Sequence, residues 1–315
     1  MPLNDLLNVE EDVLLIEDSF DALEMGLKSL DYLGRLRSLP PGAVEAAIMV
    51  GGKKGEALGA AFKNRHHDGD FWFLVPYPAA PAMRKQTEAL AGDVLGSGVV
   101  GSVKRMKVDP AKLRKALREY LSCCLVERAL CECEKEMEPL SFARNEERSS
   151  RITSLLRPLA EKGGYRLDRI DALEICCGNG MSTAPLREMF RSVLSIDNDK
   201  CALCNGLYHG TLEPDSTMLA DAMELSKYGL GTFGAVVGFM LGTIYEFNRP
   251  VWRTICAESF KALQQGGFLL LTVRTQEEMD FIAEAYASMG VDGKVIDNRQ
   301  NDSIYDSCAF FAIKK

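Results

Sequence analysis

Two glycines separated by one residue, Gly178 and Gly180, lie in the stretch ALEICCGNGMST, between an apolar run and a segment of helical pattern. Because glycine has no Cβ, backbone N–H groups and the following helix N-terminus can approach a ligand closely at such a turn. A Gly-x-Gly turn by itself also fits nicotinamide and flavin nucleotides. The turn therefore predicts a nucleotide-like ligand without identifying it.

Acidic residues near the ends of three successive predicted strands narrow the choice of ligand. Asp197 ends the second strand, where a carboxylate can accept hydrogen bonds from both ribose hydroxyls. Asp221 follows the third strand, where it can accept a hydrogen bond from an adenine amino group, while the N–H of Ala222 serves the ring. Glu174 lies inside the first strand, and we expect it to attract a positively charged amino group.

This combination favours S-adenosylmethionine over a dinucleotide. A dinucleotide site usually has an apolar residue at the position of Glu174 and a third glycine where this chain has Thr183. The methionine moiety of S-adenosylmethionine carries the amino group that the Glu174 carboxylate suits. We expect the three carboxylates to converge with the glycine turn at one cleft.

Strands and helices alternate along the C-terminal half, which predicts an α/β fold with a doubly wound, mostly parallel sheet. The last two strands have no helix between them, so the final strand is expected to be antiparallel. The predicted strands are 172–176, 193–196, 217–220, 235–240, 268–273, 294–296 and 309–313, and the helices between them are 182–190, 200–208, 251–264 and 277–289.

The segment 171–315 resembles class I S-adenosylmethionine-dependent methyltransferases. The resemblance is carried, in order, by LEICCGNG, the acid closing strand two, ADA at 220–222 and LQQGGFLLLTV at 263–273. It implies the family's Rossmann-like sheet of seven strands and a cofactor pocket at their carboxyl ends. The implied cofactor-binding residues are Glu174, Cys176, Gly178, Asn179, Gly180, Thr183, Asp197, Asn198, Asp221 and Ala222.

The chain departs from the family pattern at three places. Cys176 replaces the first loop glycine, and Gly234 replaces the frequent acid at the start of strand four. The stretch GFMLGTIYE at 238–246 also differs from the Asn/Asp-Pro-Pro-Tyr motif, which argues against methylation of exocyclic or amide nitrogens. Tyr245 and Glu246 are the catalytic candidates, together with nearby Asn248; the alternative is that Tyr245 packs and Glu246 is solvated.

Three functions stay open at this point. The first is methyl transfer to a small-molecule or protein acceptor, in which the protein aligns the acceptor with the S–CH₃ bond. The second is a nicotinamide-dependent oxidoreductase. The third is a non-catalytic relative that only binds cofactor or assembles with other proteins, with Cys176 and Gly234 as signs of lost activity.

The rest of the chain is less informative. Residues 1–108 predict a small α/β or α+β domain that selects the acceptor or forms a homo-oligomer. Residues 109–164 predict a helical connector or substrate lid, and residues 165–315 the cofactor-binding domain.

Composition excludes some partners. The net charge of −8 argues against general nucleic-acid binding, and no apolar run reaches the ~18 residues that a membrane span requires. The N-terminus has no basic segment before an apolar one, so a cytoplasmic protein with reduced cysteines is expected.

Metal-like spacings have simpler explanations. We expect the cysteines to pack as small apolar side chains and His66, His67 and Asp68 to form a polar turn, so no metal site is predicted. The cysteines concerned are Cys123, Cys124, Cys131, Cys133, Cys176, Cys177, Cys201 and Cys204.

Overall fold

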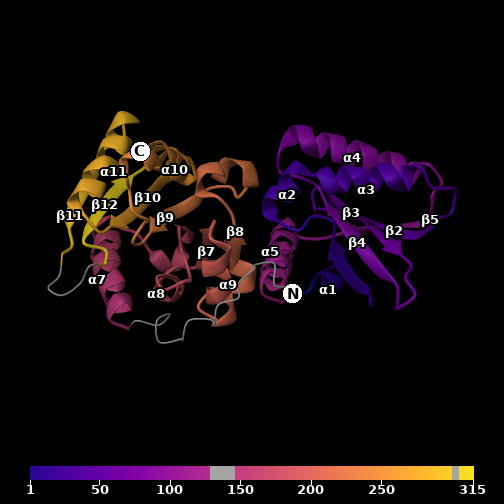
Figure 1. The fold of residues 1–315 in the computed structure, drawn as a ribbon, viewed down its shortest axis with the longest axis horizontal. Helices are drawn as coiled ribbons and strands as arrows, with labels where there is room; N and C mark the ends of the chain where they lie inside the picture. The colour runs from indigo at the N-terminus through magenta and orange to yellow at the C-terminus, as the bar shows by residue number, and fades with distance from the viewer. Residues whose placement is uncertain (128–145, 300–304) are drawn as a thin grey trace. The chain divides into compact units, whose positions relative to one another are not determined.

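The computed structural model describes residues 1–127, 146–299 and 305–315 and divides into two compact units, which Figure 1 shows in ribbon form. The first unit comprises residues 1–121 together with 227–229. The second comprises residues 122–226 and 230–315. Cys131 and Cys133 lie outside the described residues.

A mixed five-stranded sheet forms the centre of the first unit, in the order β1-β4-β3-β2-β5. Strands β2, β3 and β4 form an antiparallel meander, whereas β1 pairs in parallel with β4, and β5 in parallel with β2. The α/β or α+β domain predicted from the sequence is thus confirmed. The strands are β1 (Asp12–Leu15), β2 (Val44–Gly51), β3 (Ala57–Asn64), β4 (Phe71–Pro76) and β5 (Val100–Lys107).

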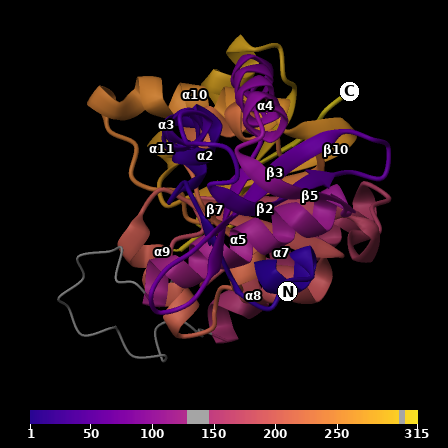
Figure 2. The same cartoon turned by 90° about the vertical axis from the view of Figure 1, so that its right-hand side faces the viewer.

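Helices cover both faces of this sheet. Figure 2 shows α3 and α4 on one face and α5 on the other. Leu33 of α3 and Val94 of α4 are buried with Phe62 of β3, while Leu113 and Leu117 of α5 are buried with the opposite face. The helices are α1 (Leu3–Leu7), α2 (Phe20–Met25), α3 (Leu27–Arg37), α4 (Pro81–Gly96) and α5 (Pro110–Glu127).

The second unit contains a seven-stranded sheet in the order β11-β12-β10-β9-β6-β7-β8. The pairings from β8 to β10 are parallel, and β12 runs antiparallel to both β10 and β11. This confirms the doubly wound sheet and the antiparallel last strand. The strands are β6 (Asp171–Ile175), β7 (Ser192–Asp197), β8 (Thr217–Leu219), β9 (Phe233–Gly238), β10 (Leu263–Val273), β11 (Gly293–Asp297) and β12 (Cys308–Ile313).

Apolar helix faces bury this sheet on both sides. Ile152 and Leu156 of α7 pack with Leu186 of α8 on one face, and Tyr286 of α11 stacks on Phe310 of β12 on the other. The helices are α7 (Glu146–Lys162), α8 (Thr183–Met189), α9 (Lys200–Tyr208), α10 (Arg249–Lys261) and α11 (Gln276–Ser288), with short 3₁₀ turns η1 (Leu167–Arg169), η2 (Pro214–Ser216), η3 (Ala222–Tyr228) and η4 (Glu246–Asn248). No helix in the described ranges combines the length and apolarity that crossing a bilayer requires.

The division into units does not coincide with the boundaries predicted at 108 and 164. Within α5, Leu113 and Leu121 belong to the core of the first unit, whereas Leu125 packs with Leu203 in the core of the second. Helix α7 packs on the seven-stranded sheet through Ile152. The two described helices of the predicted connector, α5 and α7, are therefore part of the hydrophobic cores of the units, because their apolar faces are buried there.

Candidate cofactor site

The turn after β6 contains three residues in left-handed backbone conformations, Cys176 (φ 53°), Gly178 (φ 55°) and Gly180 (φ 82°). A Cβ on Gly180 would approach the side chain of Leu212 to 2.8 Å, so only glycine fits there. Cys176 adopts a conformation that costs a non-glycine residue roughly 1 kcal/mol or more. Cys176 thus adopts a left-handed conformation that glycine would adopt at lower cost.

Glu174 is completely buried next to this turn. Its carboxylate accepts hydrogen bonds from Ser182 Oγ (2.5 Å), Thr183 Oγ1 (2.6 Å) and Ser195 Oγ (2.7 Å). Burial raises the pKa of Glu174, and the three hydroxyl donors oppose that rise. The carboxylate therefore ties β6 to α8 and β7, and its contact with a cofactor amino group stays a prediction.

Asp197, at the end of β7, connects the glycine turn to the next loop. Its Oδ2 accepts from the N–H of Gly178 (2.7 Å) and its Oδ1 from the N–H of Asp199 (2.8 Å). Burial raises the pKa of Asp197, and these backbone donors oppose the rise. Since the two oxygens of a carboxylate offer about four acceptor positions, this one keeps capacity for ligand hydroxyls.

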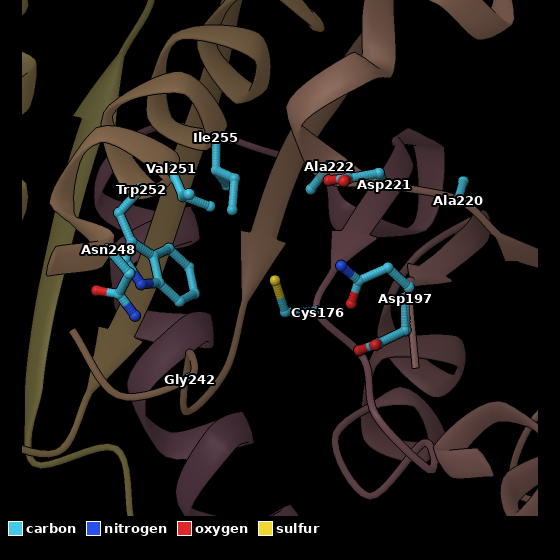
Figure 3. A pocket seen from close by; sticks show the side chains of 11 residues that line it. Cys176, Asp197, Ala220, Asp221, Ala222, Gly242, Asn248, Val251, Trp252 and Ile255 are labelled. Atoms are coloured by element: carbon cyan, nitrogen blue, oxygen red, sulfur yellow. The ribbon is translucent and has the colours of Figure 1, made fainter. Parts of the chain in front are cut away.

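A cavity of about 310 Å³ opens beside these residues (Figure 3). Such a volume falls at the lower end of the roughly 300–1,000 Å³ typical of small-molecule sites. Five residues predicted for cofactor binding line it: Cys176, Asp197, Asn198, Asp221 and Ala222. The other five predicted residues do not line it: Glu174, Gly178, Asn179, Gly180 and Thr183. Of the three carboxylates expected at one cleft, Asp197 and Asp221 therefore meet there and Glu174 does not.

Those five residues shape the turn that borders the cavity. Gly178 donates its N–H to Asp197, and the carbonyl of Asn179 accepts from Thr211 Oγ1 at 2.5 Å. Thr183 donates to Glu174. Direct contact between these residues and a cofactor remains a prediction.

The opposite wall comes from α10 and the segment before it. Figure 3 shows Trp252 and Asn248 on one side of Cys176 and Asp197 on the other. The lining residues absent from the sequence-based prediction are Ala220, Gly242, Val251, Trp252 and Ile255. The helical spacing of the last three was visible in the sequence, but it equally describes a face buried in the core.

The two catalytic candidates lie in the turn before α10 and outside the lining. Tyr245 is 54% exposed, and Glu246 is exposed and pairs with Arg249 at 2.8 Å. Asn248 does line the cavity. Its Oδ1 accepts the N–H of Tyr245 at 2.8 Å. A catalytic role for Tyr245 and Glu246 stays a prediction.

The pKa of the Cys176 thiol depends on the charges around the cavity. Burial and the neighbouring carboxylates of Asp197 and Asp221 raise its pKa. Such a thiol is a weak nucleophile at neutral pH, because the thiolate is the reactive form. The same carboxylates favour a ligand that carries positive charge.

We expect S-adenosylmethionine to protect Cys176 from slow alkylation by N-ethylmaleimide at pH 8. Bound ligand would cover the half-buried thiol, whereas exposed Cys201, outside the cavity lining, serves as the internal control. Peptide mass spectrometry over time should show the Cys176 rate falling at least about five-fold while the Cys201 rate stays constant. Equal rates for Cys176 with and without saturating ligand would contradict this location of the cofactor.

Within the described residues, no cysteine or histidine other than Cys176 lines this cavity. Cys177 and Cys204 are buried with Leu125, Leu203 and Leu212, as expected for small apolar side chains, and Cys124 is also buried. His66, His67 and Asp68 form an exposed turn between β3 and β4. Their side-chain atoms that could coordinate a metal lie within 4.8 Å of one another. Exposed polar groups often lie this close without an ion, and the turn agrees with the sequence-based prediction.

Neither a protein family profile nor a curated protein matches this chain. Among solved structures it is similar to the N-methyltransferase NodS from Bradyrhizobium japonicum WM9, with 18% identity over 54% of this chain and 96% of that one, at a TM-score of 0.39. It is also similar to CalS10, an amino pentose methyltransferase from Micromonospora echinaspora solved with bound S-adenosylmethionine. The identity is 14% over 58% of this chain and 99% of that one, at a TM-score of 0.42. A third similar structure is the sugar N-methyltransferase KedS8 from Streptoalloteichus sp. ATCC 53650. The identity is 12% over 59% of this chain and 96% of that one, at a TM-score of 0.44. At these identities and TM-scores the likeness says nothing about what this chain binds.

Proposed function

We propose that the second unit binds S-adenosylmethionine and transfers its methyl group to a small-molecule or protein acceptor. One observation carries the proposal: Asp197 and Asp221, from neighbouring strand ends, line the same cavity as Cys176 of the glycine turn. Ligands of open α/β sheets bind at this edge, outside the carboxyl ends of the strands. Two carboxylates also match a ligand with a sulfonium charge and ribose hydroxyls.

In methyl transfer, the protein mainly has to align the acceptor with the S–CH₃ bond. When S-adenosylmethionine is bound, the acceptor lone pair forms a bond to the methyl carbon, the S–CH₃ bond breaks with its electron pair left on sulfur, and an acceptor proton passes to solvent or a base. Positioning alone can supply several kcal/mol of the barrier. A general base is optional for an acceptor that is already nucleophilic.

Seven residues in or next to the cavity have assigned parts in this proposal. Asp197 would accept the ribose hydroxyls, and Asp221 with Ala222 would bind the adenine edge. Asn248 and Trp252, across the cavity from Asp197, would bound the space where an acceptor approaches. Tyr245 and Glu246 would take the acceptor proton from the adjacent turn where a base is needed.

Calorimetry on the whole chain tests this proposal. We expect S-adenosylmethionine and S-adenosylhomocysteine to bind with dissociation constants in the micromolar range, about −8 kcal/mol, and a thermal-shift series to show no effect of NADH or NADPH. Stabilisation by a nicotinamide cofactor alone would instead support the oxidoreductase. Binding of S-adenosylmethionine without product from a broad acceptor panel would support the non-catalytic alternative.

A further inference from the structure

Three large apolar side chains are exposed within seven residues beside the cavity. Phe247 is 82% exposed, Tyr245 54% and Val251 38%, and Val251 also lines the cavity. No other seven-residue window of the described ranges exposes three such side chains. Clusters of exposed apolar groups usually mark a binding surface, because leaving them in water costs free energy.

The rings of Tyr245 and Phe247 stack on each other, with centroids 5.4 Å apart and planes 9° apart. The two rings are therefore nearly parallel, and the outer face of such a stacked pair can accept another flat group. Parallel rings of this kind bind other flat π-systems by offset stacking, which adds to simple burial of area. Aliphatic ligands of equal size gain the burial but not the stacking.

Hydrogen bonds connect the backbone of the turn that carries these rings to a residue of the cavity wall. Asn248 Oδ1 accepts the N–H of Tyr245, and Asn248 Nδ2 donates to the carbonyl of Thr243 at 3.1 Å. Asn248 itself lines the cavity, so the turn that carries the rings is bonded to a lining residue. The backbone of the turn that carries the rings is thus fixed before any ligand arrives, which lowers the entropy cost of binding.

We infer that Tyr245 and Phe247 form a subsite for a planar, conjugated small-molecule acceptor, which stacks on their rings while its nucleophilic atom enters the cavity beside Trp252. The inference rests on the proposed methyl transfer and names its substrate class. Asn248 and Trp252 lie across the cavity from Asp197, so an acceptor bound against them leaves the predicted nucleoside contacts undisturbed (Figure 3).

The test uses two probes with the same carbon skeleton and a single hydroxyl, flat aromatic 2-naphthol and its saturated, non-planar counterpart decahydro-2-naphthol. Each is titrated calorimetrically into the full chain, with and without S-adenosylhomocysteine. We expect 2-naphthol to bind roughly five-fold more tightly than the saturated compound and Phe247→Ala to abolish that preference. The matched control is Tyr208→Ala, which removes an aromatic ring 62% exposed on α9, outside the cavity lining, and should preserve it.

Equal affinities for the two probes, or a preference that survives Phe247→Ala, would overturn the inference. So would light scattering showing a wild-type dimer that Phe247→Ala dissociates, because the rings would then form a subunit interface. Failure of the proposed function is separate, since it appears as no binding of S-adenosylhomocysteine, whereas the naphthol titration without that ligand still reports on the rings.

Discussion

Replacing Asp197 by alanine is expected to weaken S-adenosylmethionine binding roughly 100-fold, or about 2.7 kcal/mol. The substitution would remove the acceptor proposed for two ribose hydroxyls, and hydrogen bonds to a charged group are worth about 1.5–3 kcal/mol each. It also releases the N–H of Gly178, which Oδ2 of Asp197 accepts at 2.7 Å. Isothermal titration calorimetry measures the change directly.

Asp199 provides a matched control two residues away. Its Oδ1 caps α9 by accepting from the N–H groups of Cys201 (2.9 Å) and Ala202 (3.1 Å), and the residue does not line the cavity. Asp199→Ala should therefore cost about 1 kcal/mol of folding stability, as a lost N-cap does, with cofactor affinity within two-fold of wild type. A folded Asp197→Ala protein that binds S-adenosylmethionine as tightly as wild type would refute the assigned ribose contact.

Replacing Glu174 by alanine is expected to lower the free energy of unfolding by about 3 kcal/mol. The three hydroxyls of Ser182, Thr183 and Ser195 would lose their shared acceptor, and buried groups left unpaired cost about 1–3 kcal/mol each before they find other partners. Urea denaturation at pH 7 measures the loss. Glu174→Gln keeps the volume and one acceptor oxygen, so it should lose less than half as much.

The same pair of proteins separates two roles for Glu174. If the carboxylate acts only by holding the turn, Glu174→Gln should bind S-adenosylmethionine within about three-fold of wild type. If it contacts the amino group directly, loss of its charge should weaken binding at least about ten-fold, since a pairing with a charged group is worth about 1.5–3 kcal/mol. The measured affinity therefore shows whether Glu174 contacts the amino group of the cofactor or only holds the turn.

The pH dependence of stability follows from the buried carboxyl. Burial raises the pKa of Glu174 above its ordinary value of 4.5, so the folded protein binds this proton more tightly than the unfolded chain does. Wild type should therefore gain stability relative to Glu174→Gln as the pH falls through the folded pKa, and the gain should be complete below 4.5. A difference that stays flat across this range would show that Glu174 has an ordinary pKa.

Local sequence patterns were sufficient for the order and type of the elements in the second unit. The alternation of apolar strands with helical segments predicted the seven strands and the antiparallel β12, since periods of 2 and 3.6 residues are properties of neighbouring residues. Asp197 and Asp221 could be placed at strand ends for the same reason. Parallel strands bring such ends to one edge of a sheet, and both residues do line one cavity.

Register and helix placement required the tertiary structure. Glu174 pairs with Ser195 across β6 and β7, while Ser182 and Thr183 reach it from the start of α8; the sequence shows an acid in a strand but not which neighbours enclose it. Likewise, the spacing of Val251, Trp252 and Ile255 predicts one face of a helix, but not that this face lines the cavity. Contacts between distant segments depend on how whole elements pack, and no short stretch of sequence encodes that packing.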